Sequence, residues 1–170
     1  RLCCAMGMPY PGGVELDKTA EGGNENAYSL PRPKVDGSPY DFSFSGLKTA
    51  VINLIHNANQ RGEILPVKDL SASYRKAVVD CLERNFVKAA EDTGSAKLVI
   101  AGGVSANRLL RRRMESVCRE RGWQFFRPDL SLCGDNAAMV GAQAYYEFLA
   151  GHTAGNDLNA RPEMPMETNE

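Results

Sequence analysis

The sequence predicts an α/β fold built around a parallel sheet. Two short apolar runs, 97–101 and 123–126, each precede a segment with helical periodicity, at 107–121 and 135–149. A strand–helix–strand–helix order pairs its strands in parallel, because the connecting helix returns the chain to the same edge of the sheet. We therefore expect a βαβα unit over about 97–149.

The composition is that of an ordinary globular domain. The chain has 170 residues, 20 Lys and Arg against 21 Asp and Glu, and 43% hydrophobic residues, which argues against collagen, coiled coil and disorder. A formal net charge of −1 creates no overall field for a polyanion, so an RNA contact must come from a local patch or a partner. No apolar run approaches the ~20 residues of a membrane span, and we expect no membrane contact.

The chain ends and the cysteines carry further expectations. The start at Arg1 has neither an initiator Met nor a signal-peptide pattern, so we expect a fragment of a longer protein. Five cysteines without CxxC spacing indicate reduced thiols and a cytoplasmic location. After Gly151 the sequence becomes polar, and we expect 152–170 to form a flexible tail.

The N-terminal part of the chain is predicted to be mostly turn and loop. The segment 10–13, Tyr-Pro-Gly-Gly, is typical of a turn, and 21–40 is predicted to be loop, with short strands as the alternative. Residues 11–17 could place backbone N–H groups and the Asp17 carboxylate around a polar ligand such as a sugar hydroxyl. A plain surface turn is the alternative interpretation.

Two helices are expected before the sheet. Ser45 is placed to cap a helix that ends near Asn59, since apolar residues recur behind it at helical spacing. A longer helix is expected to begin at Asp69 or Ser71 and to stop near 93–94, where Thr-Gly ends the periodic pattern.

A glycine-rich loop joins the first predicted strand to its helix. Gly102 and Gly103 let the backbone approach a ligand, and the following helix start offers free N–H donors, so a phosphate or nucleotide could bind there. The Asn107 amide could bind a ribose or a base edge. The alternatives are a tight turn without a ligand, and an Asn107 that acts only as a helix cap.

Asp135 lies in a second loop that leads into a helix. It could cap that helix, or it could bind a divalent metal, because carboxylate oxygens suit such ions and open α/β sheets bind ligands at strand ends. One carboxylate cannot make a site, and His56 and His152 have no ligand partner at suitable spacing. A metal at Asp135 would therefore need ligands from outside this chain.

Other side chains are weaker candidates for chemistry. Lys48 could bind a phosphate, and Cys133 could be a nucleophile, although no nearby histidine would activate it. A dense basic cluster could contact an RNA backbone or form a solvated helix face. It consists of Arg108, Arg111, Arg112 and Arg113. No catalytic residue is separately identified.

Four motifs in order resemble one known family. They are YPGG at 10–13, FSFSGLKT at 42–49, VIAGGVSAN at 99–107 and DNAAM at 135–139. From about Tyr10 to Gly151 the chain resembles the C-terminal half of the TsaD family, the tRNA N6-adenosine threonylcarbamoyltransferases, formerly called O-sialoglycoprotein endopeptidases. The resemblance implies that 1–151 form the second lobe of the actin-like ATPase fold (the sugar kinase, Hsp70 and actin superfamily), with a helical insertion at about 45–93. The N-terminal lobe would be absent.

The resemblance also implies an activity and a site. The family transfers a threonylcarbamoyl group from threonylcarbamoyl-adenylate to N6 of adenosine 37 in tRNAs that read codons beginning with A. Gly13, Asp17 and Asn107 match positions that hold the nucleotide-like substrate, and Asp135 matches the metal-binding aspartate. The partner ligands in the family are histidines of the first lobe in a His-x-x-x-His motif, which this sequence lacks.

The cofactors and partners follow from the same resemblance. They are ATP or threonylcarbamoyl-adenylate, and one divalent metal, iron first, with zinc or magnesium as alternatives. The implied partners are the missing lobe, TsaB, TsaE and tRNA, in the cytoplasm.

Two other functions stay open. One is a non-catalytic interaction lobe, and the other is an ATP-dependent small-molecule kinase of the same superfamily. An idle lobe would have no need to keep Gly13, Asn107 and Asp135 together.

Overall fold

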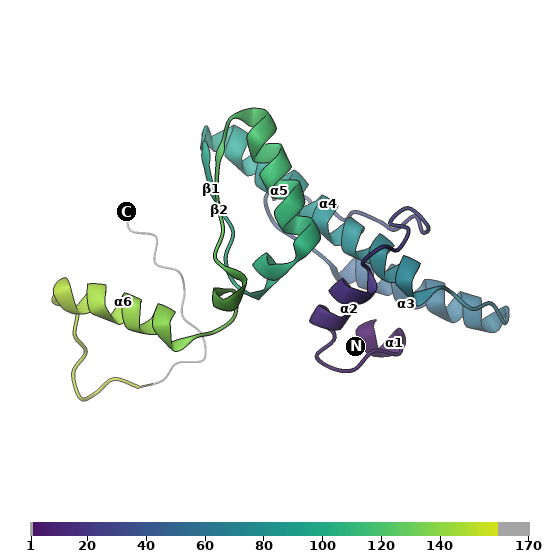
Figure 1. Ribbon diagram of the computed structural model, residues 1–170, viewed down its shortest axis with the longest axis horizontal. Helices are drawn as coiled ribbons and strands as arrows, with labels where there is room; N and C mark the ends of the chain where they lie inside the picture. Colours follow the sequence, from purple (N-terminus) through teal and green to yellow (C-terminus); the bar gives the residue numbers. More distant parts are fainter. Residues whose placement is uncertain (1, 160–170) are drawn as a thin grey trace. The chain divides into compact units, whose positions relative to one another are not determined.

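The computed structural model (Figure 1) describes residues 2–159. The chain forms two compact units, Arg1–Cys133 and Gly134–Glu170, and each is considered by itself. The first unit contains, in chain order, α1 (Leu2–Ala5), α2 (Gly13–Thr19), α3 (Ser45–Gln60), α4 (Val67–Thr93), β1 (Lys97–Val99), the 3₁₀ turn η1 (Gly103–Ala106), α5 (Arg108–Arg121), β2 (Gln124–Phe126) and the 3₁₀ turn η2 (Leu130–Leu132). The second unit contains α6 (Ala137–Leu149).

The predicted α/β class and the parallel sheet are confirmed. β1 and β2 pair in parallel with Leu98 opposite Phe125, and α5 is the helix that connects them. The sheet is backed by α4 and α5, where Leu98, Ala90 and Cys118 are buried together. Burial of these apolar side chains is what fixes the strand pair against the helices.

The two helices before the sheet are confirmed, with different start points. α3 begins at Ser45 itself, so the expected Ser45 cap is wrong by one residue: Phe44 occupies the cap position and no side chain caps the helix. α4 begins at Val67, earlier than expected, because Pro66 favours the extended conformation that precedes a first helical turn. The carboxylate of Asp69 instead accepts a hydrogen bond from the Asn24 backbone at 2.8 Å.

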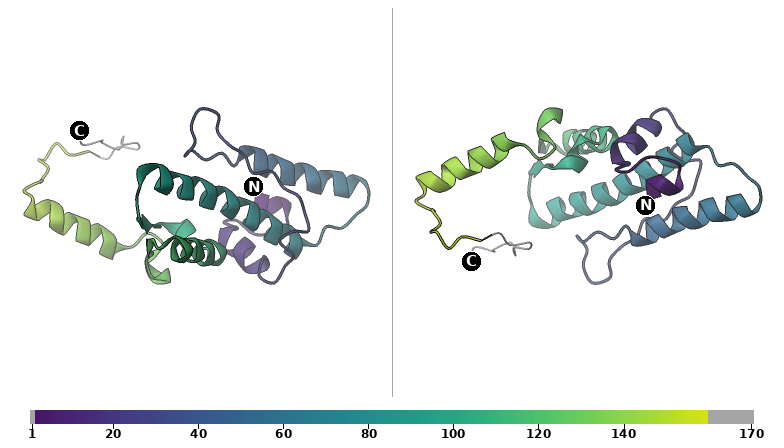
Figure 2. Two further views of the ribbon diagram at one scale, coloured as in Figure 1. Left: turned by 90° about the horizontal axis from the view of Figure 1, so that it is seen from above. Right: turned by 90° about the horizontal axis from the view of Figure 1, so that it is seen from below.

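The N-terminal segment contains helices that the sequence analysis missed. α1 and α2 flank the predicted turn. α2 packs against α4, and the two helices lie side by side in both views of Figure 2. Leu2 and Leu16 from these helices are buried in the largest apolar core together with Val51 and Leu70. The loop predicted over 21–40 is confirmed, and it has no strand within the described residues.

The second unit consists of α6 and the segment that follows it. α6 has no buried residue in the described part of the chain, and its apolar side chains Met139, Val140 and Phe148 are exposed. Residues 152–159 of the predicted tail are exposed and have no helix or strand, while 160–170 lie outside the described residues.

Two expectations about the whole chain can be compared with the structure. No helix within residues 2–159 is long and apolar enough to cross a membrane. All five cysteines are free thiols, which agrees with the prediction of reduced cysteines.

Candidate functional site

Asp17 and Asn107 lie in direct contact, although 90 positions separate them in the chain. Asn107 Nδ2 donates a hydrogen bond to Asp17 Oδ1 at 2.9 Å. α2 carries Asp17, and Asn107 stands at the start of α5, so the fold brings two of the predicted substrate-binding residues together.

Asn107 also caps its helix. Its Oδ1 accepts a hydrogen bond from Leu110 N at 2.9 Å, which confirms the capping role that was one of the two interpretations of this residue. The cap fixes the amide plane, so the Nδ2 group is directed by the helix rather than left free to rotate. Asn107 can therefore hold Asp17 and still present a second N–H to a ligand.

Arg75 donates to the same oxygen of Asp17 that Asn107 binds. Its Nη1 donates to Asp17 Oδ1 at 3.1 Å and to Glu21 Oε2 at 3.2 Å, and the arginine is only 7% exposed. The hydrogen bond from Arg75 holds the pKa of Glu21 below its usual range. Asp17 Oδ2 has no hydrogen-bond partner within the described residues, so this oxygen can accept a bond from a ligand hydroxyl.

A small cavity adjoins this contact. It has a volume of about 100 Å³ and is lined by Leu16, Arg75 and Asn107, with apolar side chains of α4 and α5. Arg75 Nε is buried and has no hydrogen-bond partner among residues 2–159. A buried N–H without a partner costs free energy, so this face of the site suits a polar ligand or water.

Gly13 is the first residue of α2 and lies at an open surface. A Cβ built at Gly13 would meet no heavy atom of the described chain within 4 Å, whereas one at Gly12 would meet Pro9 O at 2.9 Å and the side chain of Cys3. Gly12 is therefore required by packing. Gly13 leaves the backbone accessible from the surface, and its role in substrate binding stays a prediction.

The loop after β1 begins with a glycine in the left-handed region. Gly102 has φ 75°, which an L side chain rarely adopts, and the chain then forms η1 before Asn107. This loop borders an apolar cavity of about 260 Å³ that Val99, Val104 and Phe42 help to line. Phe42 belongs to the FSFSGLKT motif, so two of the motifs meet here.

Asp135 lies in the second unit and does not cap α6. Asn136 is the cap, since its Oδ1 accepts from Met139 N at 2.9 Å, so the capping interpretation of Asp135 is wrong. The Asp135 carboxylate is exposed and has no hydrogen-bond or ion-pair partner within residues 2–159. An exposed, unpaired carboxylate fits the role of one metal ligand. The described residues contain no cluster of three or more potential metal ligands.

The arginine cluster is only partly exposed. Arg111 is buried, and it donates to Pro128 O at 2.8 Å and to Cys133 Sγ at 3.0 Å. Arg113 forms an ion pair with Glu83 at 2.7 Å, and Arg112 lies 3.7 Å from Glu21. The predicted RNA contact is therefore wrong for Arg111, which is buried, and Arg113 is held by its ion pair. Arg112, whose side chain is 61% exposed, and Arg108, which is also exposed, keep both interpretations open, an RNA contact or a solvated helix face.

Cys133 and the histidines take structural places. Cys133 is 4% exposed and contacts Ser105 Oγ at 3.3 Å, so burial removes it as a nucleophile. His56 contacts Gln60 at 3.0 Å in α3, and His152 contacts Glu147 at 2.7 Å. Lys48 is exposed at the start of α3.

Arg75 is the site residue that the sequence analysis missed. It lies within a periodic helix among apolar and small residues, where an arginine indicates nothing by itself. Its place on the face of α4 that packs on α2 was a usable signal, because a charged side chain on a buried face needs partners.

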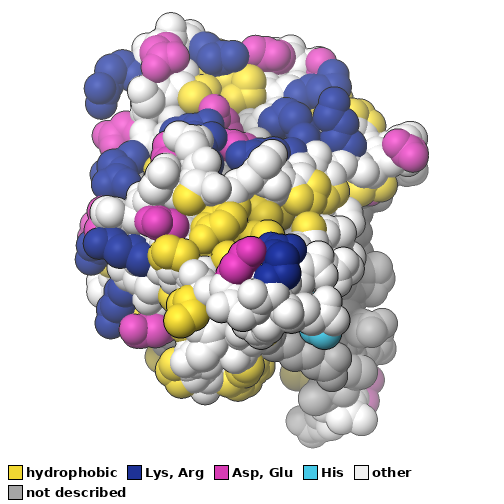
Figure 3. Space-filling model, turned by 90° about the vertical axis from the view of Figure 1, so that its right-hand side faces the viewer, with side chains coloured by type: hydrophobic (Ala, Val, Ile, Leu, Met, Phe, Trp, Pro, Cys, Tyr) yellow, Lys and Arg dark blue, Asp and Glu magenta, His cyan; other side chains and the backbone are white. Residues whose placement is uncertain are grey.

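On the surface shown in Figure 3, basic and acidic side chains alternate around a band of hydrophobic ones.

The geometry is that of an α/β protein with a polar site where the chain leaves a strand. The family profile described as TsaD: tRNA N6-adenosine threonylcarbamoyltransferase matches residues 3–142. Curated relatives named tRNA N6-adenosine threonylcarbamoyltransferase from Moorella thermoacetica and Enterococcus faecalis are 44% and 45% identical, over 98% and 96% of this chain. The chain belongs to the TsaD family. It spans about half the length of the curated relatives it matches, 48% and 47% of these two.

Proposed function

We propose that the chain is the C-terminal half of a tRNA N6-adenosine threonylcarbamoyltransferase. In this proposal, residues 1–151 form the second lobe of an actin-like ATPase fold, and an N-terminal half supplies the first. The observation that carries the proposal is the 2.9 Å contact between Asn107 Nδ2 and Asp17 Oδ1, because two side chains implied in substrate binding converge from distant parts of the chain.

The substrate is threonylcarbamoyl-adenylate, or ATP in a preceding step. Asp17 Oδ2 accepts a hydrogen bond from a hydroxyl of the ribose, and the second N–H of Asn107 donates one to the ribose or the base. The open surface at Gly13 lets the nucleotide approach the start of α2. Arg75 acts as a positioning residue, because it donates to Asp17 Oδ1 and leaves Oδ2 for the ligand.

Asp135 supplies one ligand to a divalent metal, and the N-terminal half supplies the rest. Iron is the first choice, with zinc or magnesium as alternatives. A metal held there would polarise the carbamoyl carbonyl and offset charge that develops on the acyl phosphate. The chain by itself would bind nucleotide more weakly and would not catalyse transfer.

The acceptor is N6 of adenosine 37 in tRNAs that read codons beginning with A. TsaB and TsaE are the proposed assembly partners, and the cytoplasm is the proposed location. The absence of a membrane-spanning helix in residues 2–159 bears on neither point.

The test is mass-spectrometric detection of threonylcarbamoyladenosine in tRNA. The chain is combined with its N-terminal half, TsaB, TsaE, threonylcarbamoyl-adenylate and tRNA, and compared with the Asp135→Ala variant and with Asp157→Ala, an exposed carboxylate of the same unit, as the matched control. We expect product with the wild type and with Asp157→Ala, and none with Asp135→Ala. If no threonylcarbamoyladenosine forms but a small molecule is phosphorylated, the kinase is indicated. If TsaB binds tightly and neither reaction occurs, the interaction lobe is indicated.

A further inference from the structure

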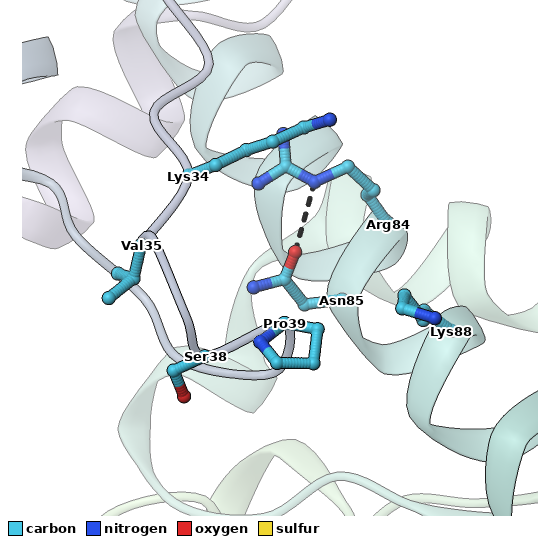
Figure 4. Close-up of a pocket in the computed structure, with 7 residues that line it drawn as sticks. All are labelled: Lys34, Val35, Ser38, Pro39, Arg84, Asn85 and Lys88. Atoms are coloured by element: carbon cyan, nitrogen blue, oxygen red, sulfur yellow. Dashed lines mark hydrogen bonds between the residues drawn. The ribbon is translucent and has the colours of Figure 1, made fainter.

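A third cavity lies away from the Asp17 and Asn107 contact, between α4 and the loop that precedes the FSFSGLKT motif. It has a volume of about 270 Å³, and Figure 4 shows the side chains that surround it. Cationic Lys34, Arg84 and Lys88 line it together with Val35 and Pro39, and none of its lining residues is acidic. A protein with a net charge of −1 has here a local concentration of positive charge.

Arg84 is held rigidly at the wall of this cavity. Its Nη2 donates to Pro33 O at 2.9 Å and its Nε to Asn85 Oδ1 at 3.0 Å, the bond drawn in Figure 4. Asn85 is 5% exposed and donates in turn to Asp41 O at 2.7 Å. No carboxylate pairs with the guanidinium within residues 2–159. Its Nη1 also donates to Arg32 O at 3.4 Å, so two of its five N–H groups, one on each Nη, remain without a partner in the described part of the chain.

The two lysines complete the positive rim. Lys34 is exposed and has no ion pair or hydrogen bond in the described part of the chain. Lys88 pairs with Asp92 at 2.8 Å, and Tyr40 Oη donates to the same carboxylate at 2.8 Å. The hydrogen bond to Asp92 raises the pKa of Lys88, so this ammonium stays charged. Of the three cations that line the cavity, only Lys88 is paired with a carboxylate in the described part of the chain.

This arrangement matches the chemistry of a phosphate group. A planar guanidinium with fixed donors binds phosphate oxygens directionally, and ammonium groups add charge. The volume is below the roughly 300 Å³ of a pocket for a whole small-molecule ligand, which favours one phosphate over a complete nucleotide. Lys34 and Lys88 lie at the open surface, so the phosphate can belong to a longer chain.

We propose that the cavity of Lys34, Arg84 and Lys88 holds one backbone phosphate of the tRNA. This inference rests on the proposed function for the identity of the RNA, and it adds a contact remote from the reacting groups. Phosphate contacts of this kind position the RNA without reading its sequence.

The test measures tRNA binding by fluorescence anisotropy over a range of salt concentrations. It uses the chain assembled with its N-terminal half, because the assembled enzyme is what meets tRNA. Lys34→Gln is the informative variant, since Lys34 makes no contact that the fold needs. Lys97→Gln, an exposed lysine on β1, is the matched control. Lys88→Gln and Arg84→Gln follow, and thermal unfolding of each variant reports whether the loop stays attached.

We expect Lys34→Gln to weaken tRNA binding roughly fivefold and to lower the slope of log K against log salt by about 0.7 to 0.9, one phosphate contact. Lys97→Gln should change neither. Equal tRNA affinity for Lys34→Gln and Lys97→Gln would overturn the inference, and so would a wild type that does not bind tRNA.

Two further comparisons distinguish free phosphate from a tRNA phosphate, and failure of this inference from failure of the proposed function. If inorganic phosphate protects Lys34 from amine modification but tRNA affinity is unchanged in Lys34→Gln, the site takes free phosphate and the tRNA assignment is wrong. If tRNA binding falls as expected but no threonylcarbamoyladenosine forms, the phosphate site stands and the proposed activity fails. If threonylcarbamoyladenosine forms but Lys34→Gln binds tRNA as tightly as the wild type, the proposed activity stands and the phosphate site fails.

Discussion

The loops before α5 and α6 have the same local structure, but their side chains have different neighbours. In both, a strand is followed by a 3₁₀ turn and by an asparagine that caps a helix, with Oδ1 accepting a backbone N–H at 2.9 Å. The Asn107 amide then reaches Asp17 at 2.9 Å, whereas the Asn136 amide turns back to Gly134 O at 3.0 Å.

The helices behind the two loops differ in the same way. α5 buries Leu109, Leu110 and Met114 against α4, while α6 has no buried residue in the described part of the chain. Local sequence is therefore sufficient to build a capped helix start. Whether that start becomes part of a ligand site depends on which distant segment packs against it. Four substitutions or conditions test this comparison.

Asp135→Ala should have the largest effect, and only on activity. Transfer should fall roughly 100-fold or more if the carboxylate binds the metal. The free energy of unfolding should change by less than about 0.5 kcal/mol, because Asp135 makes no described contact and Asn136 is the cap. Metal content and product are measured on one preparation. Wild-type activity would remove the metal role and leave this loop structural.

Asn107→Ala should reduce both stability and nucleotide binding. Loss of the cap costs about 1 kcal/mol, and loss of the hydrogen bond to Asp17 costs about 1 kcal/mol more. Nucleotide affinity, measured by calorimetry, should fall roughly tenfold, while the metal content stays unchanged. Asn107→Ser keeps a capping oxygen but lacks the Nδ2 donor and adds no charge beside Asp17, so it should restore about half of the lost stability and none of the affinity. Unchanged affinity in both variants would reduce Asn107 to its capping role.

Low pH should loosen α5 before it affects α6. Burial acts to raise the pKa of Asp80, but hydrogen bonds from Arg32 and Lys76 outweigh it and hold that pKa below its usual range. Asp80 also pairs with Arg113 of α5 at 3.2 Å.

The sign follows from this lowered value. A carboxyl with a lowered folded pKa stabilises the fold above its unfolded pKa of about 3.9, and this contribution is lost as the pH falls through the folded value. Amide hydrogen exchange of α5 should therefore accelerate below about pH 4, and Asp80→Asn should abolish this dependence. Equal acceleration in both helices would mean that Asp80 does not hold α5.

Asn136→Ala should have the smallest effect. It removes a cap worth about 1 kcal/mol to α6 alone, so exchange of the first α6 amides should accelerate while the first unit unfolds as before. Asn136→Ser is the control, because serine is a comparable cap. A loss of stability in the first unit as large as that of Asn107→Ala would show that the two loops are not different.

Much of the fold was predictable because it is encoded within one or two turns of chain. The alternation of apolar runs with helical periods predicted the parallel strand pair and α5, and Gly94 ended α4 as expected. The start of α4 was misplaced, since Pro66 begins the helix before its apolar pattern appears. α2 was missed because seven residues are too few for a clear period.

Sequence by itself determined which groups are available: the polar residues before the two helices, Asn107 and Asp135 among them, the glycines, and the four family motifs. Tertiary structure decided their partners. It joined Asn107 to Asp17 across 90 positions, buried Arg111, and set Arg84 beside Lys34 around one cavity. The physical reason is range: capping and periodicity act within a turn or two of helix, whereas ion pairing and burial depend on segments that meet only after the chain has folded.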